Sequence, residues 1–222
     1  MNKKPIASLS KALCAGMFLF GLVSTANAAL ISRLGGLAVY DTDLDITWLA
    51  DANAGAGSTF DDGVSSSDGR MTWGNANAWA ASLNVGGVTG WRLPTTQQPD
   101  PSCGNQSGDA IPQGFGSGCT GSEMGHLFNE EGITANAPGV FSNVQSLSYW
   151  SGTEFAPVPV NAWLFNFNFG IQFADVKDLN LFAWAVHSGD VGASSVPEPG
   201  TIALMGLGLL GLLGFGRRQR RR

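Results

Sequence analysis

Charged residues are scarce in this sequence of 222 residues, and positive charges are scarcer than negative ones. Asp, Glu, Lys and Arg together make up 13% of the chain, against about 25% in an ordinary soluble domain. Twelve Lys and Arg face 17 Asp and Glu, which gives a net charge of −5. Because such a chain offers no basic field to a phosphate backbone, the composition argues against nucleic-acid binding.

Histidine is also rare, and this limits the chemistry that the chain can perform. The two histidines are His126 and His187. Neither has partners at the spacing of zinc ligands, and neither accompanies a recognisable nucleophile motif. Without a nucleophile and its base, we expect no enzyme activity. The chain does contain 44% hydrophobic and 10% aromatic residues, which is enough apolar surface to exclude a disordered protein.

The first segment, residues 1–28, has the pattern of a secretory signal peptide. Three lysines precede a short apolar run over residues 12–23, and the segment ends in small residues at Ala26 and Ala28. A signal peptidase is therefore expected to cut after Ala28, once the export machinery has carried the following residues across the inner membrane.

The last segment, residues 196–222, combines three features. A Val-Pro-Glu-Pro-Gly sequence comes first, an apolar run over residues 201–216 follows, and five arginines stand within residues 217–222. As a helix the run is about 24 Å long, which is short for a bilayer but long enough to insert with local thinning. The arginines predict a transmembrane helix with its tail in the cytoplasm and everything upstream exported.

These three features resemble the PEP-CTERM sorting signal of Gram-negative bacteria. The resemblance implies an exosortase, a membrane cysteine protease, as partner, with cleavage near Pro197, Glu198 and Pro199. It also implies transient anchoring in the inner membrane, followed by transfer to the cell surface or extracellular matrix. Such a tail is a sorting signal and gives no information about the function of the exported part.

The exported part, residues 29–195, is far more acidic than the whole chain. It holds four Lys and Arg against 16 Asp and Glu, a net charge of −12. The other cations belong to the two terminal segments. An acidic, aromatic-rich surface suits cations and neutral glycans better than nucleic acid or an anionic membrane.

Two helices are predicted in this part. Tryptophans, alanines and a leucine recur at helical spacing over residues 71–83, the pattern of an amphipathic helix. Residues 120–123 have the spacing of a capping box and predict a short second helix that runs to Phe128. Residues 91–95 are expected to be extended.

Strands are predicted before and after these helices. Residues 163–173 alternate between apolar and polar, which predicts either one long strand or a hairpin that turns near residues 168–170. Residues 181–186 supply a final strand, and short β-prone runs cover residues 37–41 and 46–49. Helices early and strands late favour a single α+β domain.

Two loops are predicted between these elements. Residues 51–68 are rich in Gly, Ser, Asp and Ala, and residues 98–121 are poor in hydrophobic residues but contain Cys103 and Cys119. In an exported protein an isolated cysteine pair most simply forms one disulfide. A metal-binding pair is the alternative.

Most of the exported part resembles the DUF1566 family, also called the Lcl C-terminal family. The resemblance implies a C-type-lectin-like fold and an extracellular adhesion or glycan-binding role. It rests on the order and spacing of six blocks between residues 39 and 190: Ile46–Asn53, Trp73–Leu83, Gly90–Thr95, Glu123–Leu127, Tyr149–Thr153 and Ala162–Phe167.

Three residues are candidates for ligand binding. Arg92 follows Trp91, where its guanidinium could stack on the indole and bind a carboxylate with both arms. A structural role is the first interpretation of Arg92, and a ligand role is the alternative. Gln98, Pro99 and Asp100 match the Q-P-D tripeptide with which galactose-type C-type lectins bind calcium and sugar hydroxyls, although the companion W-N-D triplet is missing. Gln98 and Asp100 are therefore the candidate calcium ligands.

A second calcium pattern fails. Asp41, Asp43 and Asp45 mimic the first half of an EF-hand loop, but Ile46 replaces the required glycine and Ala52 replaces the bidentate glutamate. These three acids are instead expected to alternate along the edge of a sheet.

The sequence therefore favours an exported surface or matrix protein with a lectin-like module that binds polysaccharide. A secreted hydrolase that acts on a matrix polymer is one alternative, and a purely structural envelope protein is the other. A saturable ligand distinguishes the binding module from the structural protein, and turnover distinguishes the hydrolase from both.

Overall fold

The computed structural model describes residues 29–62, 65–108 and 110–193. The predicted signal peptide with its cleavage site after Ala28 lies outside these residues. So does the predicted sorting segment, residues 196–222, with its transmembrane helix. In the part of the chain that is described, no helix has the length and apolar character needed to cross a membrane.

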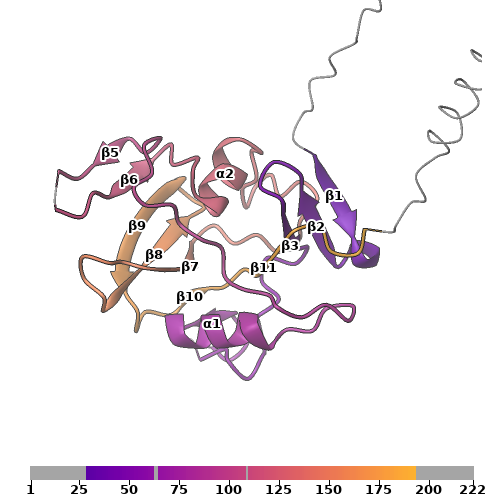
Figure 1. Ribbon diagram of the computed structural model, residues 1–222. Coiled ribbons are helices and arrows are strands. Elements are labelled where there is room, and N and C mark those ends of the chain that lie inside the picture. The colour runs from indigo at the N-terminus through magenta and orange to yellow at the C-terminus, as the bar shows by residue number, and fades with distance from the viewer. Residues whose placement is uncertain (1–28, 63–64, 109, 194–222) are drawn as a thin grey trace, which may run out of the picture.

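The described residues fold mostly into β-sheet (Figure 1). One antiparallel sheet has the strand order β1-β2-β3-β11, and the other has the order β4-β10-β7-β8-β9-β6-β5. The first sheet contains β1 (Leu30–Arg33), β2 (Ala38–Asp41), β3 (Ile46–Leu49) and β11 (Val186–Ser188). The second contains β4 (Arg70–Met71), β5 (Asn105–Gln106), β6 (Gly114–Ser117), β7 (Ser148–Glu154), β8 (Asn161–Asn166), β9 (Ile171–Val176) and β10 (Leu181–Phe182).

Among the described residues, two short α-helices accompany the sheets, α1 (Trp73–Ser82) and α2 (Glu123–Asn129), together with one 3-10 turn (Leu34–Gly36). Four strands, β1 to β4, precede both helices. The β-prone runs predicted over residues 37–41 and 46–49 are confirmed as β2 and β3. Sheet predominates, so the described residues contain less helix than the predicted α+β class suggests.

Helix α1 confirms the helix predicted over residues 71–83. Its buried residues are Ala76, Trp79 and Ala80, which face the core, as the apolar spacing requires. Met71 belongs instead to strand β4, where it pairs with Leu181 of β10.

Helix α2 is also present, but its first turn differs from the prediction. Ser122, and not Thr120, is the residue before the helix, and no side chain caps the helix there. The carboxylate of Glu123 accepts hydrogen bonds from Arg92 and from the backbone N–H of Thr95. Glu123 therefore binds a neighbouring segment, and the predicted capping box does not form.

The alternating segment 163–173 belongs to a hairpin. β8 and β9 pair antiparallel, with Leu164 opposite Phe173. The side-chain oxygen of Asn166 accepts hydrogen bonds from the backbone N–H groups of Asn168 and Phe169, at 2.9 and 3.2 Å. This local turn ends the first strand, so the hairpin alternative is confirmed and the single long strand is wrong.

The predicted final strand over residues 181–186 is divided between the two sheets. Phe182 pairs with Tyr149 of β7 in the larger sheet, and Val186 pairs with Trp48 of β3 in the smaller one. Trp184 lies between these pairings with none of its surface exposed. The segment passes from one sheet to the other, and Trp184 fills the core between them.

Two further predictions need correction. Asp41 ends β2 and residues 42–45 form the turn to β3, so the three acids do not alternate along a sheet edge. In this turn the Asp41 carboxylate accepts the backbone N–H groups of Asp43 and Leu44. The predicted loop 98–121 contains β5 and β6, and β6 extends the larger sheet by pairing with β9.

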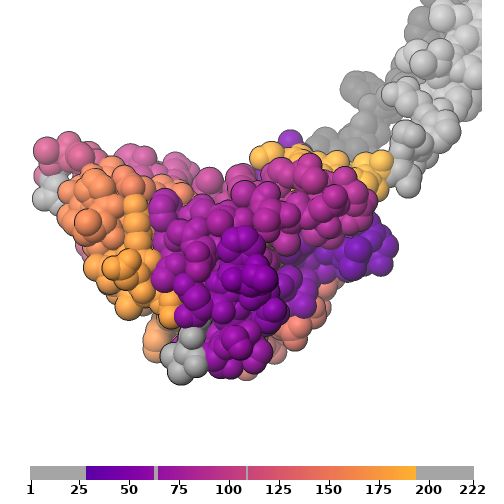
Figure 2. Space-filling model, turned by 90° about the horizontal axis from the view of Figure 1, so that it is seen from below, coloured from indigo at the N-terminus to yellow at the C-terminus, as the bar shows by residue number. Residues whose placement is uncertain are grey.

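Both ends of the described chain lie at the same end of the molecule. The guanidinium of Arg33 at the end of β1 binds the carboxylate of Asp190 with a nitrogen–oxygen distance of 2.6 Å. Figure 2 shows the first strands in indigo and the last residues in yellow side by side. β5, β6 and β9 lie at the opposite end of the molecule (Figure 1). The ends of the described chain and the β5–β6 segment therefore lie at opposite ends of the domain.

Candidate functional site

An aromatic cavity lies where the β5–β6 segment meets the β8–β9 hairpin. Its volume is about 320 Å³, within the range of ligand sites in proteins. Apolar side chains, four of them aromatic, make up most of its wall. The lining residues are Ser107, Gln113, Phe115, Phe155, Trp163, Phe173 and Ala174.

The aromatic side chains of this cavity come from three strands and a strand end. Phe155, just after β7, packs edge-on against Trp163 of β8, with 5.2 Å between the ring centres and 80° between the planes. Trp163 is buried but does not belong to the central core cluster. Phe115 of β6 is 39% exposed at the rim. This aromatic cluster therefore lies beside the core and is joined to it by Phe173, which packs against the core.

Polar groups on one side of the cavity hold the β5–β6 loop in shape. The backbone N–H of Ser107 donates to the carbonyl of Gln113 at 2.8 Å, and the N–H of Gln113 donates to the Ser107 hydroxyl at 3.0 Å. The Gln113 amide also donates to the carbonyls of Ile111 and Pro112. An apolar wall with a few fixed polar groups is the usual composition of a small-molecule site.

The disulfide loop next to this cavity confirms the predicted pairing of Cys103 with Cys119. Gln172 of β9, which is 1% exposed, donates to the carbonyl of Gly114 at 3.1 Å. Gln98 exchanges two hydrogen bonds with the backbone of the same glycine, at 2.8 and 3.0 Å. The disulfide and these amides fix the loop that carries Phe115 and Gln113.

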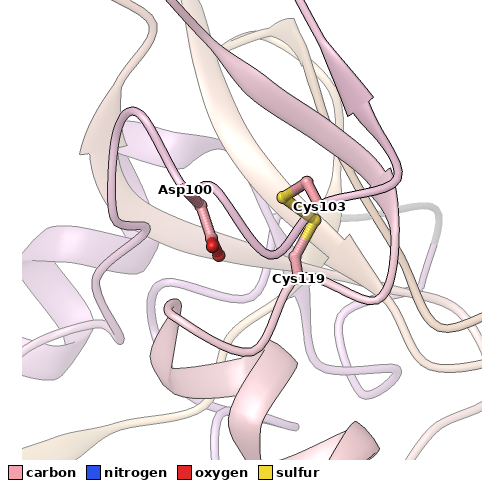
Figure 3. A group of neighbouring side chains, drawn as sticks. All are labelled: Asp100, Cys103 and Cys119. Carbon is pink, nitrogen blue, oxygen red and sulfur yellow. A yellow bond between two sulfur atoms is a disulfide. The ribbon is translucent and has the colours of Figure 1, made fainter.

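Gln98 and Asp100 do not converge on an open cavity. Asp100 is fully buried. Its carboxylate accepts hydrogen bonds from the backbone N–H groups of Ser102 and Gly121, both at 3.0 Å, and from the hydroxyls of Ser102 and Ser122. Figure 3 shows this carboxylate beside the Cys103–Cys119 disulfide. With its oxygens and that of Gln98 engaged in the loop, the pair does not fit a calcium site in this arrangement, and calcium binding there stays a prediction.

Asp100 also lies near the sulfurs of Cys103 and Cys119. Both sulfurs are part of the disulfide, and a disulfide sulfur lacks the thiolate charge that a metal requires. Because the two cysteines form the predicted disulfide, they are not the metal-binding pair of the alternative prediction.

Arg92 binds a carboxylate with both arms, as expected, but does not stack on Trp91. Its two terminal nitrogens lie 2.8 and 2.7 Å from the Glu123 oxygens, and one of them also donates to the carbonyl of Leu93. Trp91 packs instead against His187, with 5.7 Å between ring centres. These contacts tie the extended segment 91–95 to α2, which is a structural role.

Loss of the disulfide is expected to lower the free energy of unfolding by about 3 kcal/mol, because the bond closes a 16-residue loop. The double substitution Cys103→Ala and Cys119→Ala should show this loss in urea unfolding followed by circular dichroism. Reductant should destabilise the wild type equally and leave the double variant unchanged. A wild type whose unfolding midpoint does not respond to reductant would contradict the expected role.

Comparison with known families gives two matches. The model of the Lcl C-terminal domain matches residues 37–187. The model of the PEP-CTERM protein-sorting motif matches residues 195–222. No curated protein and no solved structure matches the chain. Both resemblances seen in the sequence are thereby confirmed.

The sorting motif indicates export, processing by an exosortase, and sorting to the cell surface or extracellular space of a Gram-negative bacterium. The predicted processing residues Pro197, Glu198 and Pro199 lie within the matched range but outside the described residues. The domain match covers more than half of the chain and includes the disulfide, Arg92 and every lining residue of the aromatic cavity. The chain therefore belongs to the Lcl C-terminal domain family and carries a PEP-CTERM sorting motif after its folded domain.

Proposed function

We propose that the exported domain is a polysaccharide-binding module of the cell surface or extracellular matrix, with a lectin-like mode of binding and no enzymatic turnover. The observation that carries this proposal is the aromatic cavity lined by Phe115, Phe155, Trp163 and Phe173. Aromatic rings offer large, rigid apolar surfaces on which the C–H faces of sugar rings can pack. The C-type-lectin-like fold that the family resemblance implies is part of the same proposal.

The charge of the domain supports a neutral sugar as the ligand. Residues 29–195 carry a net charge of −12, which repels nucleic acids and other polyanions. The four Lys and Arg side chains of this range do not line the cavity. Packing and hydrogen bonding, and not ion pairing, would therefore supply the affinity.

The position of the cavity also supports binding outside the cell. The last described residue, Ala193, stands two positions before the match to the sorting motif begins at residue 195. The motif therefore follows the end of the domain at which β1 and β11 lie, whereas the cavity lies near β6 and β9 at the other end (Figure 1). A domain held by its tail would present the cavity away from the anchor.

Binding can be tested with the exopolysaccharide of the producing bacterium and a glycan array, each with and without calcium. We expect saturable binding that Phe115→Ala weakens about 5- to 10-fold, since one aromatic contact contributes about 1 kcal/mol. The matched control is Phe169→Ala, because Phe169 is 67% exposed in the β8–β9 turn and does not line the cavity. Its affinity should equal that of the wild type.

Three results would contradict this function. The absence of any glycan signal would favour a purely structural envelope protein. If Phe115→Ala and the wild type bound the glycan with equal affinity, the glycan would not bind in the cavity. Release of new reducing ends from the polysaccharide would identify a hydrolase.

A further inference from the structure

Three titratable side chains from distant parts of the sequence meet beside α2. They are Asp41 at the end of β2, His126 in α2, and Glu131 just after α2. One carboxylate oxygen of each acid and one ring nitrogen of His126 all lie within 4.8 Å of one another. The distance between Nε2 of His126 and Oε1 of Glu131 is 3.9 Å. None of these residues lines the aromatic cavity.

All three atoms are buried and lack a hydrogen-bond partner. Oδ2 of Asp41, Nε2 of His126 and Oε1 of Glu131 are unpartnered, and Asp41 has no exposed surface at all. A buried polar atom without a partner costs about 1–3 kcal/mol, and a charged one costs more. Three such atoms on the side chains of one cluster indicate a shared partner at its centre.

The backbone holds these side chains in place. The other oxygen of Asp41, Oδ1, accepts the N–H groups of Asp43 and Leu44 at 3.0 and 3.2 Å, so Oδ2 is left to face the cluster. The carbonyl of His126 accepts the N–H of Glu130 at 2.8 Å and that of Glu131 at 3.4 Å. His126 and Glu131 therefore come from one hydrogen-bonded turn, which supports both side chains.

The cluster has two carboxylates and no lysine or arginine. Residues 29–193 contain four Lys and Arg, and each makes its contacts elsewhere: Arg33 with Asp190, Arg70 with the ring of Phe182, Arg92 with Glu123, and Lys177 with Glu154. Burial raises the pKa of the Glu131 carboxyl, and the nearby Asp41 carboxylate raises it further. A bound cation would remove this repulsion.

We propose that Asp41, His126 and Glu131 bind one divalent transition-metal ion, with Zn²⁺ as the reference probe. One imidazole nitrogen and two carboxylate oxygens are a common ligand set for such ions, and three protein ligands leave a position for water or another oxygen ligand. Bonds of about 2.0–2.2 Å place ligand atoms about 3–3.5 Å apart. Each side chain then needs to move by less than about 1 Å.

The test uses the untagged full-length protein with Cys14→Ser in every sample, so that a free thiol does not compete for the metal. After treatment with a chelator, the protein is titrated with Zn²⁺ in a calorimeter. We expect one equivalent to bind and Tm to rise, because an ion that binds only the folded state stabilises it. Co²⁺ provides a second readout through the visible absorption that reports its coordination geometry.

Ligand variants connect the bound ion to this cluster. His126→Gln and Asp41→Asn should each weaken Zn²⁺ binding by at least about 100-fold, since loss of an outer-shell partner alone costs 10- to 100-fold. The matched control is His187→Gln, because His187 also has a buried, unpartnered nitrogen but belongs to no comparable group among the described residues. Its affinity should equal that of the wild type. Glu131→Gln replaces either ligand variant that fails to fold.

Three outcomes would overturn the proposal. They are binding of much less than one equivalent of Zn²⁺ by the wild type, equal affinities of the wild type and the ligand variants, and binding of Ca²⁺ in place of Zn²⁺ and Co²⁺. The last would indicate an all-oxygen site in which His126 has no part.

Discussion

Replacement of Trp184 with alanine is expected to lower the free energy of unfolding by about 3–5 kcal/mol, the cost of removing a fully buried aromatic side chain. Trp184 is the residue at which the chain passes between the two sheets, and it has no exposed surface. Its indole N–H donates to the carbonyl of Leu49 at 2.8 Å. Four rings surround it at centre-to-centre distances of 5.0–5.9 Å, those of Trp48, Phe141, Tyr149 and Phe167.

The measurement is urea unfolding followed by circular dichroism, because tryptophan fluorescence changes with the substitution itself. Trp184→Phe separates the two contributions of the side chain. It retains an aromatic ring but leaves the Leu49 carbonyl without its donor, so a smaller loss of about 1–3 kcal/mol is expected. A loss below about 1 kcal/mol for Trp184→Ala would show that this cluster is not the core that joins the two sheets.

Gly125→Ala is expected to destabilise the domain by about 3 kcal/mol or more, although alanine favours helices. A Cβ atom at Gly125 in α2 would overlap the backbone carbonyl of Cys119. That carbonyl belongs to the disulfide loop and cannot rotate away as a flexible side chain would. Overpacking of this kind costs about 1–3 kcal/mol where the neighbours can shift, and more where they cannot.

Gly74→Ala in α1 is the matched control. It is the same substitution in the other helix, and a Cβ atom there would meet nothing within 4 Å. The gain in helix propensity should leave stability unchanged or raise it by up to about 1 kcal/mol. Thermal unfolding of both variants compares them directly, and equal Tm values would contradict the close approach of α2 to the disulfide loop.

Local elements of the fold could be predicted from the sequence. Apolar spacing located α1, and alternation located the β8–β9 hairpin, because these patterns depend on residues only a few positions apart. The start of α2 could not be located in the same way. Its predicted capping residue Glu123 binds Arg92, a partner that no local pattern reveals.

The candidate sites were less accessible to sequence reasoning. Trp163 and Phe173 were visible as parts of an apolar alternation, but the participation of Phe115 depends on how the β5–β6 segment pairs with β9. The tripeptide match at Gln98 and Asp100 was a local pattern, yet hydrogen bonds within the loop engage both side chains.

By itself, the sequence determined the C-terminal sorting motif, the family, the cysteine pair, and the local helices and hairpin. These features depend on composition, order and short-range periodicity. Only the tertiary structure decided that residues 181–186 divide between two sheets, that four aromatic rings line one cavity, and that Asp41 faces His126 and Glu131. The physical reason is that each of these features depends on long-range strand pairing and side-chain packing. Such contacts join residues far apart in the chain and leave no periodic pattern in the sequence.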